Sequence, residues 1–185
     1  MDSTSLRLAY AGLLEAAENV TEAGAETTPP PGEWDAHQLL AHLVSVDAGV
    51  LAVVCSVAAG GQATFDNRLS LDPWNLGRIN ERAGGQAQAR QRIKVQGEAL
   101  CALAGQLSED ELDQPIPTLL LSGHTLLVDQ PVSLRDLISG LADDQPPTAH
   151  TATPPAADAR PGTRRLVASP DMIDSCCPLA SSHDS

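Results

Sequence analysis

The clearest helical pattern in the chain is WDAHQLLAHLVSVDAGVLAVVCSVAAGG, residues 34–61. Asp35 stands where a helix N-cap is expected, and Gly60 and Gly61 end the pattern. Aliphatic side chains recur every three or four positions, as on the buried face of a helix. They are Leu39, Leu40, Leu43, Val46, Val50, Val53, Val54 and Val57. The stretch therefore predicts a long helix that begins after Trp34 and buries one face.

A second helical stripe precedes this stretch, and it ends at Gly24 and a proline-rich loop. Its members are Leu6, Leu8, Ala11, Leu13, Leu14, Ala17 and Val20. A third, longer helix is predicted from Asp72 and Pro73, with Asp as the cap and Pro in the first position. Gly84 and Gly85 are expected to kink this helix. Its stripe is Ile79, Ile93, Val95, Leu100, Leu103 and Leu107.

The end of the folded body has a different pattern. Ser108 opens a capping box with Glu111, which predicts a short helical turn. Residues 115–132 hold two apolar runs on either side of Ser122-Gly123-His124, which favours a small β-hairpin. Ser133 then caps a short helix over residues 134–141. We therefore predict an all-α fold, a four-helix bundle with a β-hairpin-like excursion before its last helix.

The length of 185 residues fits one domain with a tail. Residues 145–185 hold seven of the 14 prolines and few large aliphatic side chains. Such a segment buries too little apolar surface to offset its ordering entropy. We therefore place the bundle at residues 4–144 and predict that residues 145–185 form a disordered Pro- and Ala-rich tail.

Charge and apolar content exclude several classes of partner. Eleven basic against 24 acidic residues give a net charge of −13, which argues against nucleic acid and against an anionic membrane surface. The longest apolar-rich run, residues 48–59, is too short to span a bilayer, and the N-terminus lacks the features of a signal peptide. A cytoplasmic protein is expected.

The cysteines give no sign of a redox or metal motif. Cys55 and Cys101 lie in apolar stretches, where a free cysteine is usually a small buried hydrophobic residue. Cys176 and Cys177 are adjacent, which is not the spacing of a metal knuckle. All four are expected to be non-catalytic.

His42 is the strongest candidate for chemistry because it interrupts the apolar run of the helix after Trp34. One interpretation is a buried neutral histidine with a single hydrogen bond. The other is a metal ligand, although a metal site needs three or four donors. His37 is predicted to face solvent, and Asp47 could assist His42 although it is not an i+4 partner.

Three weaker candidates have structural explanations. The Gly60-Gly61 and Gly84-Gly85 pairs lack the Lys-Ser/Thr that follows a phosphate loop. Ser122 and His124 lie too close in sequence to act as nucleophile and base, and they fit a hairpin tip. The acidic residues 109–111 fit the solvated first turn of a helix.

The segment from Trp34 to Leu43, WDAHQLLAHL, resembles the tryptophan–histidine signature of the DinB-like superfamily. Residues 65–68 (FDNR), 74–76 (WNL) and 134–138 (LRDLI) are also similar to actinobacterial members, and the similarity covers about residues 4–144. The superfamily includes mycothiol-dependent maleylpyruvate isomerases and bacillithiol transferases. The resemblance implies a four-helix bundle that binds zinc or nickel through one histidine on the second helix and two donors near the fourth.

By this resemblance His42 matches the first metal ligand, whereas the later His-x-x-x-His or Glu-x-x-x-His pair is missing. Residues 145–150 are QPPTAH, and two prolines exclude a helix there. His150 is a single donor without a second histidine four residues away. A reading-frame slip near Asp144 would explain this change, and sequencing of the gene would test it.

Two functions follow from the resemblance. The first is a metal-binding transferase or isomerase that uses a low-molecular-weight thiol of the mycothiol type, which the metal would deprotonate for attack on an electrophile. The second is a non-enzymatic, degenerate bundle with an incomplete metal site. Either protein is expected to be a monomer or a homodimer.

Overall fold

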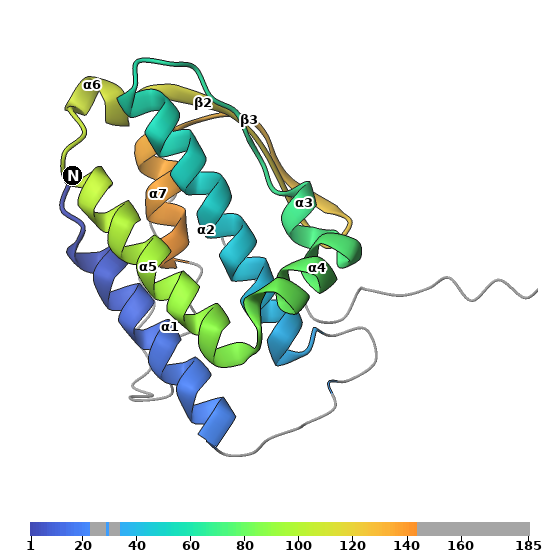
Figure 1. Ribbon diagram of the computed structural model, residues 1–185. Coiled ribbons are helices and arrows are strands. Elements are labelled where there is room, and N and C mark those ends of the chain that lie inside the picture. Colours follow the sequence, from blue (N-terminus) through green and yellow to red (C-terminus); the bar gives the residue numbers. More distant parts are fainter. Residues whose placement is uncertain (23–28, 30–33, 144–185) are drawn as a thin grey trace, which may run out of the picture.

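The structure is a computed structural model, and it describes residues 1–22, 29 and 34–143 (Figure 1). Its helices are α1 (Thr4–Glu22), α2 (Ala36–Ala58), α3 (Arg68–Leu71), α4 (Pro73–Ala83), α5 (Gln86–Ala104), α6 (Glu109–Leu112) and α7 (Leu134–Asp143). Its strands are β1 (Phe65–Asp66), β2 (Pro115–Ser122) and β3 (Thr125–Ser133). The predicted disordered tail, the reading-frame change and His150 lie outside the described residues.

Helices α1, α2, α5 and α7 form the predicted bundle. Helix α5 packs against both α1 and α2, and α7 contacts the same two helices, so α1 and α2 are diagonal partners. Figure 1 shows α1 and α5 running side by side with α7 behind them. The core is aliphatic, and its largest fully buried side chains are Leu76, Ile93, Leu100, Leu112, Ile116, Leu134, Ile138, Val50, Val54 and Val57. The all-α prediction is confirmed.

Helix α2 begins at the predicted cap. The Asp35 side chain accepts from the backbone N–H of Gln38 at 2.7 Å, and the Gln38 side chain accepts from the backbone N–H of Asp35 at 3.0 Å. This reciprocal pair satisfies two N–H groups that the first turn of a helix cannot satisfy itself.

The predicted stripe of α2 is confirmed at Val50, Val53, Val54 and Val57, but the first half of the helix differs from it. Leu39 is 48% exposed, whereas its neighbour Leu40 is 5% exposed. The buried positions in this half are Leu40, Ala41, Val44 and Asp47. A stripe drawn from apolar residues assumes that no polar side chain turns inward, and Asp47 does so here. The predictions for Leu8 and Val95 are also wrong: both are exposed, whereas Tyr10 and Gly97, which the predicted stripes left out, are buried.

The long helix predicted over residues 72–107 is two helices rather than one kinked helix. Helix α4 begins at the predicted Asp72 cap, whose side chain accepts from the N–H of Asn75 at 2.9 Å. Gly84 and Gly85 take positive φ values of 79° and 117°, so the backbone turns between α4 and α5. The turn lets both helices pack against α2.

The predicted hairpin is present and belongs to a sheet of order β1-β2-β3. Strands β2 and β3 are antiparallel, and Gly123 has a positive φ of 55° at their turn. Pro131 of β3 lies opposite Pro117 of β2. The short strand β1 adds in parallel to β2, which the sequence did not predict.

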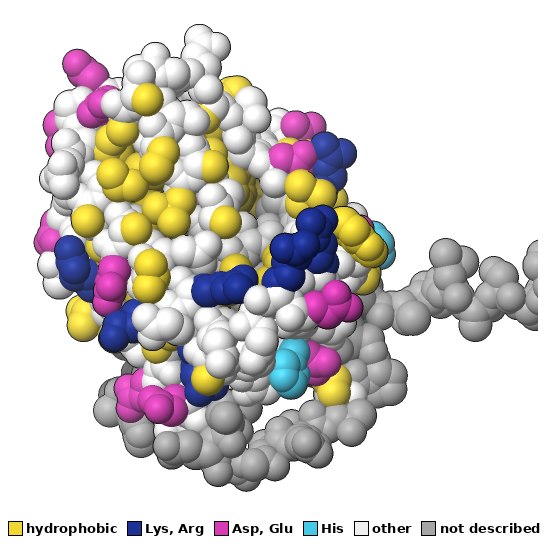
Figure 2. Space-filling model, viewed as in Figure 1, with side chains coloured by type: hydrophobic (Ala, Val, Ile, Leu, Met, Phe, Trp, Pro, Cys, Tyr) yellow, Lys and Arg dark blue, Asp and Glu magenta, His cyan; other side chains and the backbone are white. Residues whose placement is uncertain are grey.

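The outward face of α2 is uncharged over much of its length. Ala48, Ala52 and Cys55 are exposed there, and Figure 2 shows hydrophobic side chains gathered over the ends of α2 and α5. The prediction that Cys55 is buried is therefore wrong, because its apolar neighbours in sequence point the other way; Cys101 is buried as predicted. By length and composition α2 could cross a membrane, but the core helix of a bundle passes the same test.

Candidate functional site

His42 lies in the second turn of α2, where α3 crosses it. Its Nδ1 is 2.7 Å from the backbone oxygen of Ser70. A carbonyl oxygen only accepts, so Nδ1 carries the proton in this contact. The neutral imidazole therefore keeps its lone pair on Nε2, the atom available to a proton or a metal ion.

The surroundings of His42 favour this neutral form. Burial lowers the pKa of His42, and the hydrogen bond to Ser70 opposes that shift more weakly. The Trp34 ring lies 4.8 Å from the imidazole, centre to centre, and is tilted by 52°. Trp34 is 36% exposed, so its indole covers the histidine at the surface of the fold. At neutral pH the His42 imidazole is therefore uncharged, and its Nε2 has a free lone pair that a metal ion could bind.

The carbonyl that orients His42 is held in place from the sheet. Asn67, which is buried, donates to the backbone oxygen of Leu121 at 2.8 Å and accepts from its N–H at 2.9 Å. The Asn67 side chain thus pairs with β2 as an extra strand residue would. The backbone oxygen of Asn67 also accepts from the backbone N–H of Ser70 at 2.9 Å, so the pairing of Asn67 with the sheet also positions α3.

A second contact ties α3 to α2. The Ser70 hydroxyl donates to the Ser45 hydroxyl at 3.0 Å, one turn of α2 beyond His42. Asn75 of α4 donates to the Leu69 carbonyl at 2.8 Å. Sequence reasoning missed Asn67, Ser70 and Asn75, because no periodicity marks them. The sequence signals for this region were the Trp34–His42 pair and the resemblance of residues 65–68 and 74–76 to the superfamily, which gave these side chains no role.

The other candidate side chains do not join His42. His37 is exposed, as predicted, and His124 is exposed at the hairpin turn. Asp47 does not assist His42, since its Oδ1 accepts from the Tyr10 hydroxyl at 2.7 Å.

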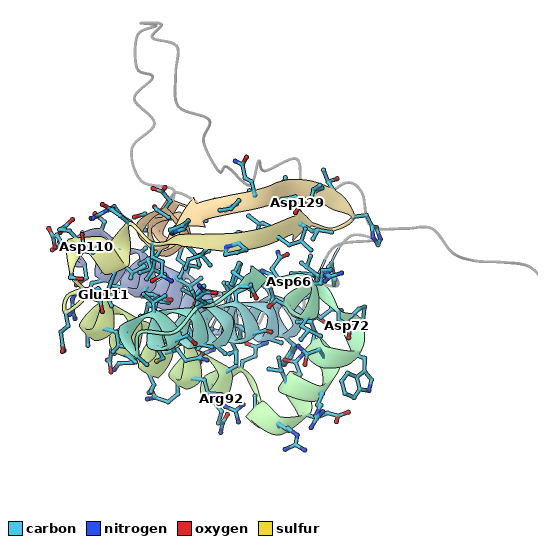
Figure 3. All side chains as sticks on the ribbon, turned by 90° about the horizontal axis from the view of Figure 1, so that it is seen from above. Asp66, Asp72, Arg92, Asp110, Glu111 and Asp129 are labelled. Carbon is cyan, nitrogen blue, oxygen red and sulfur yellow. The ribbon has the colours of Figure 1, made fainter. Side chains whose placement is uncertain are left out.

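The acidic side chains outside the core are dispersed. Figure 3 places Asp110 and Glu111 at one end of the molecule and Asp66 and Asp72 at the other. Ser108 and Glu111 form the predicted capping box of α6, so the acidic run has a structural role.

Metal-ligating side chains do not converge within residues 1–22, 29 and 34–143. No group of three His, Cys, Asp or Glu side chains in this part of the chain could hold a metal ion. His42 is one prepared donor, and a protein metal site takes three or four. The described residues therefore do not form a complete metal site.

A family model of the DinB superfamily matches residues 5–163. The chain belongs to the DinB superfamily. The match runs beyond Asp144, where we expected the similarity to end, and its range includes His150. No curated protein and no solved structure matches the chain. Membership agrees with the bundle and with the Trp34–His42 signature.

Proposed function

We propose that this DinB-superfamily protein binds a divalent metal ion, zinc or nickel, through Nε2 of His42. The observation that supports this most is the hydrogen bond from Nδ1 to the Ser70 carbonyl. Histidines that ligate metals almost always donate their other ring N–H to a carbonyl, carboxylate or water, which fixes the tautomer. His42 meets that requirement without any rearrangement.

The reaction we propose is a transfer or isomerisation that uses a low-molecular-weight thiol, as the resemblance to thiol-dependent DinB-like enzymes implies. A bound metal ion would deprotonate a coordinated thiol. In this chain the Ser70 carbonyl orients the imidazole, and the Trp34 ring packs against it. A cytoplasmic location, where thiols stay reduced, would suit such a protein.

A second candidate is a non-enzymatic bundle of the same superfamily. It is favoured by the lack of a three-donor group among the described residues. In that case His42 is a core histidine, and the Ser70 hydrogen bond serves only to satisfy a half-buried ring.

Metal content separates the two candidates. The full chain, without a histidine tag, is purified and analysed for zinc and nickel beside His42→Ala and His150→Ala variants. About one ion per chain, lost in His42→Ala, supports the metal-binding function. A folded wild-type protein without metal supports the non-enzymatic bundle. Loss in His150→Ala as well would add that residue to the donors.

A further inference from the structure

A buried hydrogen bond crosses the bundle between its two diagonal helices. The Tyr10 hydroxyl of α1 donates to Oδ1 of Asp47 on α2 at 2.7 Å. Asp47 is only 4% exposed. The Tyr10 ring lies directly over Gly97 of α5, where a Cβ atom would come within 2.8 Å of it. Three helices therefore meet at this pair.

Two buried oxygen atoms near this pair lack a hydrogen-bond partner among the described residues. They are Oδ2 of Asp47 and Oε1 of Gln96. Gln96 lies on α5 beside Gly97, and its Nε2 donates to the Val44 carbonyl of α2 at 3.2 Å. Val44 precedes Asp47 by about one helical turn, so the Gln96 amide contacts α2 within one turn of Asp47.

The chemistry of these two oxygens shows that they lack a hydrogen-bond donor. An ionised carboxylate and an amide oxygen both only accept hydrogen bonds. They can satisfy each other only if one of them carries a proton, and the carboxyl group is the one that can.

We propose that Asp47 is held as the neutral carboxylic acid, with its Oδ2–H donating to Oε1 of Gln96. A single proton then satisfies both oxygens and completes a series of hydrogen bonds from Tyr10 through Asp47 to Gln96. This hydrogen-bonded series, the three-helix lock, joins α1, α2 and α5 inside the core. The lock loosens when Asp47 loses its proton.

The groups around Asp47 do not compensate a negative charge. Burial raises the pKa of Asp47 to about 7, and the Tyr10 hydrogen bond opposes this more weakly. The Tyr10 phenol of α1, whose pKa is raised, is the titratable group in contact with it, and Cys101 of α5 acts on that phenol. Helix α7 contributes the apolar Leu134 and Ile138 to the core. No cation among the described residues contributes to the pKa shift of Asp47.

The direction of the pH effect follows from this shift. A carboxyl group with a raised pKa in the folded state stabilises the fold below its unfolded pKa of 3.8. That stabilisation is lost as the pH rises from about 4 to about 7. The lock is therefore tight in mildly acidic solution and loose in alkaline solution.

An Asp47→Asn variant of the full chain tests the lock. Its amide can accept from Tyr10 and donate to Gln96 at every pH, like the neutral acid. The melting temperature of the variant, relative to wild type, should rise as the pH is raised from about 5 to about 8. An Asp129→Asn variant, which changes an exposed carboxyl group, should show no such trend. A difference that is constant or falls with pH would overturn the proposal.

Carbon-13 NMR of the wild-type carboxyl groups provides a readout that needs no variant to fold. One aspartate should titrate with a midpoint near 7, and its signal should be absent from Asp47→Asn. A midpoint near 4 for Asp47 would overturn the proposal. Gln96→Met tests the partner, because the alkaline gain from Asp47→Asn should shrink in that background. An undiminished gain would show that Gln96 is not the acceptor.

Discussion

Two titratable side chains five residues apart on α2 show opposite responses to the same burial. Burial lowers the pKa of His42 and raises that of Asp47, so both are driven toward their neutral forms. Neutral His42 has a lone pair to offer on Nε2, at the edge of the fold beside Trp34. Neutral Asp47 has a proton to offer, inside the core. His42 is therefore positioned to bind a ligand, whereas Asp47 is positioned to stabilise the fold.

This comparison depends on the orientation of α2, which buries Leu40 and Asp47 and exposes Leu39. Leu40→Ala should reduce the free energy of unfolding by ~2–5 kcal/mol, as expected for a buried leucine. Leu39→Ala should change it by less than ~0.5 kcal/mol, as expected at the surface. Urea unfolding of both variants measures these free energies. Equal losses of stability would contradict this orientation of α2.

The Asp47 region also depends on the close approach of Tyr10 to α5. Gly97→Ala places a methyl group against three atoms of the Tyr10 ring, so it should cost ~1–3 kcal/mol of stability. Gly12→Ala is the matched control, because a Cβ at Gly12 meets nothing within 4 Å. This helical substitution should stabilise by up to ~1 kcal/mol. Thermal unfolding measures both variants. A higher melting temperature for Gly97→Ala than for wild type would contradict the close contact between Tyr10 and Gly97.

The smallest expected effect concerns apo His42. Its pKa is lowered in the folded state, so the stability it contributes is present above the unfolded value of 6.5 and is lost as the pH falls. Between about pH 7.5 and about pH 5, wild type should therefore lose stability relative to His42→Gln, which can still donate to Ser70. His37→Gln, at an exposed position, should follow wild type. An opposite trend would contradict the burial of His42.

Local patterns were sufficient to predict much of the fold. Helical periodicity and the Asp35, Asp72 and Ser108 caps predicted the main helices, and alternation around Gly123 predicted the hairpin. These features depend on neighbours within a few residues, which a sequence shows directly. The same holds for the Trp34–His42 pair, eight positions apart.

The rest of the site depends on contacts between distant segments. The carbonyl of Ser70 reaches His42 across 28 positions, and Asn67 pairs with Leu121 across 54. A short helix such as α3 has no stripe, so periodicity cannot place these polar groups. Asp47 was considered only as an assistant to His42, because its partner Tyr10 lies on another helix.

Titration of zinc into the apo protein tests the role of His42 most directly. Calorimetry would compare the full-length wild type with His42→Ala at about pH 7.5 and about pH 5.5. A histidine must lose its proton before it binds a metal, so we expect binding in wild type that weakens at the lower pH. Binding should be lost or much weaker in His42→Ala at both pH values. Equal affinity in the two proteins at both pH values would contradict a metal-binding role for His42.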